Sequence, residues 1–86
     1  MNQINNINKQ FYIYRYVYHD EVIYLGKTNR NLYYRIQEHK NEIKFMPYLS
    51  DVKIQYYELK TQVEMDIAEK YWINIYSPRL NVVDMD

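Results

Sequence analysis

Residues 11–18 carry a tyrosine at every second position, and this alternation constrains the fold more than any other feature of the chain. One face would present Phe11, Ile13, Arg15 and Val17, and the other Tyr12, Tyr14, Tyr16 and Tyr18. A repeat of two residues predicts a β-strand. A second run, Val22 to Gly26, follows the polar segment His19-Asp20-Glu21. The two runs therefore predict an antiparallel hairpin.

The register of this hairpin depends on the length of its loop. A two-residue turn at His19-Asp20 would pair residues whose numbers sum to 39, and would mix the two faces. A three-residue loop, His19-Asp20-Glu21, gives an even sum. The even register groups Phe11, Ile13, Val17, Ile23 and Leu25, and puts Tyr14 with Tyr24 on the opposite face. Because register follows the hydrophobic pattern, we expect the three-residue loop.

Gly26 is the only glycine among the 86 residues, whereas ordinary domains contain about 7% glycine. Glycine allows a positive φ, or lets another group approach the backbone closely. We therefore expect a backbone constraint at Gly26, where the second strand ends.

The next segment, residues 31–45, has helical periodicity. Leu32, Ile36, His39 and Ile43 form one stripe, with Arg35 at its edge and Pro47 ending the helical region. Arg35 and His39 are therefore neighbours at i, i+4 and point toward the sheet. Val52 to Leu59 is β-prone and predicts a third, antiparallel strand.

A second helix begins at Thr61, because Thr61 and Glu64 form a capping-box pattern. It runs to about Tyr76, where Ser77-Pro78 stops it. Two apolar stripes are expected along it, and Glu69 lies within the second. The stripes are Ile67, Ala68, Tyr71 and Ile75, and then Met65, Trp72 and Tyr76. A helix that is apolar on two sides is expected to be largely buried, which would make Glu69 a costly carboxylate.

The whole chain predicts one α+β domain over residues 11–86, a small three-stranded antiparallel sheet flanked by helices, after a leader at residues 1–10. There is no cysteine for disulfides or thiolate–metal bonds. No apolar run approaches the ~20 residues of a membrane span. The polar N-terminus does not resemble a signal peptide, so we expect an intracellular, cytoplasmic protein with no membrane partner.

The charges are balanced overall but not along the chain. Net charge is zero, which argues against a nucleic-acid partner, yet residues 1–45 hold seven Lys or Arg against four acids, and residues 46–86 hold four against seven. A basic half beside an acidic half fits phosphate binding next to a metal site. Scattered surface charge is the simpler alternative.

Together these residues resemble the GIY-YIG endonuclease family. Tyr12-Ile13-Tyr14 stands in its first motif and Tyr24-Leu25-Gly26 in its second. Arg35 and His39 follow on the first helix, then Glu69, and Pro78-Arg79-Leu80-Asn81 completes the order. The resemblance covers residues 12–81 and departs from the family pattern at Tyr12, which replaces a glycine.

The resemblance implies hydrolysis of DNA phosphodiester bonds with one divalent cation, magnesium or manganese, bound by Glu69. An ion pair between Glu69 and a Lys or Arg is the structural alternative. Arg35 would clamp the scissile phosphate. Tyr14 would be the general base and Tyr24 would bind phosphate or share the proton network. Lowering a phenol pKa from about 10 to 7 needs about three units, which Lys27, Arg35 and the metal would supply.

The remaining candidates surround these groups. His39 would orient a tyrosine or water or protonate the leaving group, unless it is a core histidine. Lys27 and Arg30 would contact phosphate or remain solvated, and Gly26 would let the strand end beside the phosphate. Asn81 would tie the chain end to the site or cap a turn.

Two functions remain in competition: a metal-dependent DNA endonuclease, and a catalytically silent module of the same family that binds nucleic acid or protein. A catalytic unit this small is expected to discriminate DNA sequence poorly unless it forms a homodimer or has a partner protein. The sequence leaves open the target, the strand outcome and the biological role.

Overall fold

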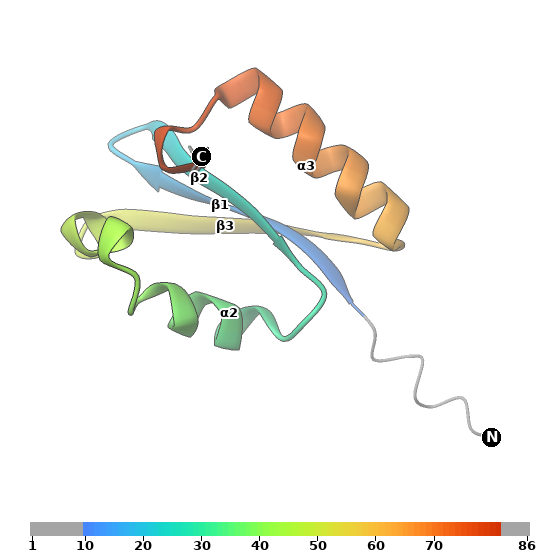
Figure 1. Cartoon of the computed structure of the whole chain (residues 1–86), viewed down its shortest axis with the longest axis horizontal. Coiled ribbons are helices and arrows are strands. Elements are labelled where there is room, and N and C mark those ends of the chain that lie inside the picture. The colour runs from blue at the N-terminus through green and yellow to red at the C-terminus, as the bar shows by residue number, and fades with distance from the viewer. Residues whose placement is uncertain (1–9, 82–86) are drawn as a thin grey trace, which may run out of the picture.

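The computed structural model describes residues 10–81, in which helices cover both faces of a three-stranded antiparallel sheet (Figure 1). The strands are β1 (Phe11–Tyr18), β2 (Glu21–Thr28) and β3 (Val52–Leu59), in the order β2-β1-β3. The helices are α2 (Leu32–His39) and α3 (Gln62–Tyr76), with 3₁₀ turns η1 (Ile43–Tyr48) and η2 (Arg79–Asn81). The predicted α+β class is therefore confirmed. Most of the predicted leader, residues 1–9, lies outside the described residues.

The hairpin has the predicted even register over most of its length, but a different loop. Tyr12 pairs with Thr28 and Tyr16 with Tyr24, whereas Tyr18 pairs with Glu21 across a two-residue turn. The register shifts after Tyr16, at a β-bulge that absorbs one residue. The predicted three-residue loop is therefore wrong: a two-residue turn and a bulge together give the same register.

The turn residues His19 and Asp20 both have left-handed backbones, with φ of 48° and 68°. Two-residue hairpin turns need such angles because they match the twist of the strands. The bulge also moves Ile23, which packs with Tyr14 and Tyr16 and not with Leu25 as expected. Asn-Gly or Asp-Gly would have signalled this turn, and His-Asp does not.

Two small cores lie on opposite sides of the sheet. We call one the aromatic core, formed by Tyr14, Tyr16, Ile23 and Phe45 on the side of α2. The other is the aliphatic core, formed by Ile13, Leu25 and Met65 on the side of α3. In Figure 1, α2 and α3 lie on opposite sides of the strands. The alternation in β1 thus separates the two cores, as the sequence predicts.

The first helix is shorter than expected: α2 ends at His39 instead of residue 45. The chain then turns into η1, where Pro47 lies inside the 3₁₀ turn and does not end the α-helix. Ile43, predicted in the buried stripe, is 80% exposed, whereas Phe45 is fully buried. Burying a phenylalanine contributes about 1.5–3 kcal/mol, more than the helix propensity of a few residues.

The second helix has the predicted ends. Thr61 accepts a hydrogen bond from the Glu64 backbone N–H at 3.1 Å, and Glu64 reaches back to the Lys60 N–H. Ser77 ends the helix with φ of 44°, and Pro78 follows.

The prediction that this helix is largely buried is wrong. Met65 is its one buried residue, and Ile67, Tyr71 and Ile75 are each more than half exposed. A three-stranded sheet presents too narrow a face to cover both stripes, and α3 lies mainly over β2 and β1. Among the described residues, no helix has the length and apolar character needed to cross a bilayer.

Candidate functional site

Gly26 makes room for the ring of Tyr14. It lies inside β2, opposite Tyr14 in β1, and not at the strand end that the sequence suggested. Its φ is not positive. A Cβ there would lie 2.6 Å from both Cζ and the hydroxyl oxygen of Tyr14, and 2.9 Å from Tyr24 Cε2. The constraint on Gly26 is therefore close approach by the Tyr14 side chain.

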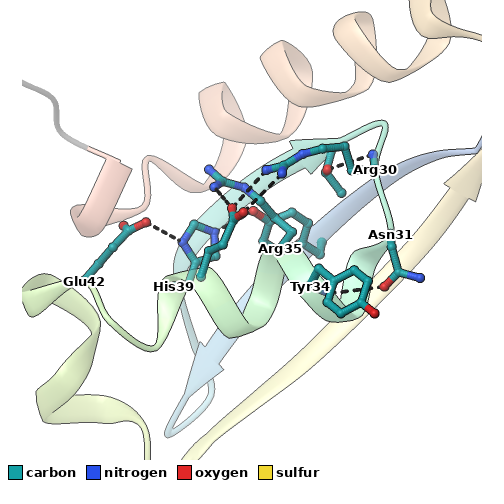
Figure 2. A network of polar contacts seen from close by, with 9 residues as sticks. Arg30, Asn31, Tyr34, Arg35, His39 and Glu42 are labelled. Atoms are coloured by element: carbon teal, nitrogen blue, oxygen red, sulfur yellow. Dashed lines mark hydrogen bonds and ion pairs between the residues drawn. The ribbon is translucent and has the colours of Figure 1, made fainter.

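A chain of polar contacts begins at the buried Tyr14 and ends at the partly exposed Glu42. The Tyr14 hydroxyl lies 2.6 Å from His39 Nε2, and His39 Nδ1 lies 3.1 Å from Glu42 Oε2. Figure 2 shows the second of these contacts, between α2 and the turn that follows it. Burial lowers the pKa of His39, although Glu42 opposes that effect. A neutral His39 donates its Nδ1–H to Glu42, and its Nε2 then accepts from Tyr14.

The protein does not lower the pKa of the two tyrosines. Burial is the largest effect on Tyr14 and Tyr24 and raises the pKa of both. The charge of Arg35 lowers both values, but burial outweighs it. Of the three groups expected to lower the pKa of Tyr14, Arg35 acts in that direction but does not outweigh burial. The contribution expected from a metal ion stays a prediction. Lys27, which was expected to contribute, is paired elsewhere.

Arg30 and Arg35 converge on one carboxylate. Arg35 Nη1 lies 2.7 Å from Glu38 Oε1, and Arg30 contacts both oxygens of Glu38 at 2.9 and 3.1 Å. Figure 2 shows both guanidinium groups meeting at this point. The two arginines hold the pKa of Glu38 at about 2. Two such donor groups also match the oxygens of a phosphate.

Lys27 lies between two carboxylates on α3. Its Nζ is 2.8 Å from Asp66 Oδ1 and 3.2 Å from Glu69 Oε1. The alternative for Glu69, an ion pair with a basic residue, is thus present in the structure. The Glu69 side chain is 22% exposed, so it is less buried than its stripe predicted.

The carboxylates of Asp66 and Glu69 are also possible ligands for a metal ion. No group of three or more His, Cys, Asp or Glu side chains suited to a metal occurs within residues 10–81. Asp66 and Glu69 nevertheless direct one oxygen each to a single cationic atom. Mg²⁺ is commonly held by one or two carboxylates, with water and substrate phosphate completing its coordination. The donor set therefore fits this ion if Lys27 moves aside.

Asn81 joins the end of the described chain to β2. Its Oδ1 accepts from the Leu25 N–H at 2.8 Å, and its Nδ2 donates to the Leu25 carbonyl at 2.9 Å. Leu25 lies in an edge strand, so this amide satisfies backbone groups that a neighbouring strand would otherwise pair. Asn81 was expected either to tie the chain end to the site or to cap a turn. The structure shows the first role, because the Asn81 side chain binds the backbone of Leu25, next to Gly26.

The predicted residues form two groups on either side of β2. Tyr14 lies in the aromatic core, and Tyr24 and His39 pack against the same aromatic cluster. Lys27 pairs with Ile13 and so belongs to the opposite face, where it meets Glu69.

Sequence reasoning missed three acids, Glu38, Glu42 and Asp66. Each lies three residues from a predicted site residue: Glu38 from Arg35, Glu42 from His39, and Asp66 from Glu69. That spacing places side chains together along a helix, and was the available signal.

Comparison of the chain with protein-family models, with curated proteins and with solved structures gives no match.

Proposed function

We propose that this protein is a metal-dependent DNA endonuclease that acts as GIY-YIG nucleases do. The observation that carries the proposal is the buried contact of 2.6 Å between the Tyr14 hydroxyl and His39 Nε2, with Glu42 on the other ring nitrogen. A hydroxyl, a neutral imidazole and a carboxylate in this order form a proton-transfer chain.

In this mechanism the attacking water gives its proton to the Tyr14 oxygen as the Tyr14 proton passes to His39 Nε2. Tyr14 remains a phenol before and after the step, so its raised pKa does not stop it from relaying a proton. His39 becomes an imidazolium, which the Glu42 carboxylate stabilises. The water oxygen forms a new bond to phosphorus as the bond to the leaving oxygen breaks. The leaving oxygen takes a proton from solvent water, and His39 returns its proton to solvent before the next cycle.

The phosphate would bind at the surface beside the aromatic core, near Tyr24 and α2. Arg35 would donate to a nonbridging phosphate oxygen, with Tyr24 beside it, and Arg30 would contact a neighbouring phosphate. Asp66 and Glu69 lie on the α3 side of β2, which is an edge strand. A divalent cation held there, magnesium or manganese, would therefore meet a phosphate that spans the edge of β2, and would lower the pKa of bound water and offset the phosphate charge.

Cleavage of supercoiled plasmid DNA tests this proposal. With Mg²⁺ we expect nicked or linear product, which Glu69→Ala and Arg35→Ala abolish and Tyr14→Phe strongly reduces. EDTA should stop the reaction in every case. Equal cleavage by the wild type and Glu69→Ala would rule out this function.

One observation favours a second candidate, a catalytically silent module that binds nucleic acid or a protein. The cations assigned to phosphate are already paired: Arg30 and Arg35 with Glu38, and Lys27 with Asp66 and Glu69. DNA would have to compete with these carboxylates. Binding that strengthens at low salt without any cleavage in Mg²⁺ would support the silent module.

A further inference from the structure

A groove of about 450 Å³ lies between α2 and the sheet, separate from the contacts of Tyr14 and His39. Its walls are mainly aromatic and aliphatic, and the side chains that form them are Tyr12, Leu32, Tyr33, Ile36, Ile54 and Tyr56. The amide of Asn31 also lines it. The groove therefore combines aromatic faces with one polar group that can donate and accept hydrogen bonds.

The tyrosines of this groove are open to solvent to an unusual degree. Tyr33 is 65% exposed and Tyr56 is 63% exposed, and Ile54 beside them is 36% exposed. Tyr12 meets Tyr56 edge to face, with ring centroids 5.9 Å apart at 76°. An edge-to-face pair leaves ring faces available for a further planar group.

The groove lies immediately beside the candidate reaction centre. Tyr56 is the direct cross-strand partner of Tyr14, on the opposite side of β1 from Gly26. Directly opposed residues in an antiparallel pair share a face, with Cα atoms about 4.5–5.5 Å apart. Tyr12 is about 7 Å from Tyr14 along the strand. A nucleotide attached to a phosphate at Tyr14 can therefore place its base in this groove.

Two cations belong to the same segment as the groove, although neither lines it. Arg30 and Arg35 are next to Asn31 and Ile36 in the sequence, and their guanidinium groups meet at Glu38. Aromatic rings on which bases can stack, together with cations on the same segment for the backbone, are the chemistry of a site for single-stranded nucleic acid.

Tyr12, which stands where the GIY-YIG motif has a glycine, contributes to this groove. A glycine at this position would remove one aromatic wall of the groove. The tyrosine instead completes a pair with Tyr56.

From these observations we infer that the groove binds an unpaired DNA base next to the phosphate that is cleaved. This inference rests on the proposed nuclease function and narrows its substrate to DNA with single-stranded segments. Bases inside a duplex are stacked on one another, so their ring faces are not available to Tyr33 and Tyr56. An unpaired base offers both faces and an edge that the Asn31 amide can contact.

Equilibrium binding in EDTA separates this inference from cleavage. The probes are a single-stranded oligothymidylate, the same oligonucleotide with abasic sites, and a duplex of equal length. We expect the full chain to bind the oligothymidylate at least about 10-fold more tightly than the abasic strand. Tyr56→Ala and Tyr33→Ala should each remove most of this difference and leave the affinity for the abasic strand unchanged.

Tyr57→Ala is the matched control. Tyr57 is 70% exposed and adjacent to Tyr56, but faces the α3 side of the sheet. The Tyr57→Ala variant should bind the oligothymidylate as tightly as the wild type does. Equal affinity of the wild type for the base-bearing and abasic strands would overturn the inference, as would equal losses in Tyr56→Ala and Tyr57→Ala.

Two further outcomes distinguish the inference from the function on which it rests. If base-dependent binding persists but Mg²⁺ gives no cleavage of plasmid DNA, the groove is supported and the nuclease function fails. If cleavage occurs and Tyr56→Ala alters self-association in sedimentation instead of oligonucleotide binding, the groove is a contact between copies and the inference is wrong.

Discussion

The two sides of the sheet bury different chemistry. The aromatic core packs around His39, which is 1% exposed and hydrogen-bonded to Tyr14. The aliphatic core contains Ile13, Leu25 and Met65 and no polar side chain among its buried residues. One strand supplies both sides through its alternation. In the proposed function the proton chain lies on the aromatic side, whereas the metal ligands Asp66 and Glu69 come from α3 on the other side. Changes in the aliphatic core itself should therefore affect stability, and changes in the proton chain should affect cleavage.

Among changes within the two cores, Tyr14→Phe should produce the largest effect, and mainly on cleavage. Loss of the hydroxyl breaks the proton chain to His39, and general acid–base catalysis of this kind contributes about 100- to 10,000-fold. The free energy of unfolding should change by only about 1–2 kcal/mol. Rates of Mg²⁺-dependent cleavage and urea unfolding measure the two quantities.

Tyr16→Phe is the control for that variant. Tyr16 is equally buried in the aromatic core, but the proposed proton chain does not include it. The Tyr16→Phe variant should cleave DNA at nearly the wild-type rate. A similar loss in both variants would show that the core, and not the proton chain, supports activity.

Met65→Ala should have the opposite pattern. Met65 is 2% exposed in the aliphatic core, and truncating such a side chain costs about 2–5 kcal/mol of stability. Cleavage per folded molecule should be unchanged at a temperature where the variant is folded. A fall in that specific activity would contradict the division between the two faces.

Gly26→Ala should affect both cleavage and stability, because Gly26 lies against Tyr14, the proposed proton relay, and within the β1–β2 hairpin. The added Cβ would lie 2.6 Å from Tyr14, so the ring must move. Displacement of a catalytic group by about 1 Å can cost about 100-fold in rate, and overpacking costs about 1–3 kcal/mol. Kinetics and unfolding of one preparation give both numbers. Unchanged kinetics would show that the position of the Tyr14 ring is not critical.

Alkaline pH should lower the free energy of unfolding through the buried tyrosines of the aromatic side. Burial raises the pKa of Tyr16 to about 12 and also raises that of Tyr14 and Tyr24. The folded state then retains protons that the unfolded state loses, so this stability is complete below pH 10 and declines as pH rises above it. Each tyrosine contributes at most about 1.4 kcal/mol per pH unit. Tyr16→Phe should show a shallower decline in unfolding free energy above pH 10, and an unchanged slope would contradict its burial.

Glu38→Gln should give the smallest effect, a gain of a few-fold in DNA affinity at low salt. Arg30 and Arg35 lose their shared carboxylate and become free for phosphate. The dependence of affinity on salt should also become steeper. Asp51→Asn, which removes one exposed charge away from these arginines, is the control and should show the smaller gain. Equal gains would mean that net charge alone is responsible.

The sequence predicted those parts of the fold that repeat along the chain. Alternation in residues 11–18 predicted the strand, its two faces and the even register, and Thr61 with Glu64 predicted the start of α3. The two-residue turn was rejected because it would mix the two faces, and the bulge after Tyr16 that restores the register has no signal in the alternating pattern. The early end of α2 depends on burying Phe45, a tertiary contact that periodicity does not contain.

For the candidate site, the sequence predicted the positions of several residues but not their protonation or their ion pairs. Tyr14 and Tyr24 were predicted to share a face and do so, and His39, predicted to point toward the sheet, packs against both rings. Their protonation could not be predicted, because burial and Arg35 act on the same phenols in opposite directions and only the structure gives their balance. The partner of Lys27 was also hidden, since Asp66 and Glu69 meet it only when α3 packs on β2.

The central claim is that His39, held by Glu42, accepts the proton that Tyr14 relays. The most direct test is the pH dependence of the cleavage rate in saturating Mg²⁺ between pH 5 and 10. Burial keeps the pKa of His39 below its usual 6.5, so the rate should rise only at acidic pH and stay level from about pH 7 upward. A rate that instead continues to rise tenfold per pH unit toward pH 10 would show that a Tyr14 phenolate is the base, and would contradict this account.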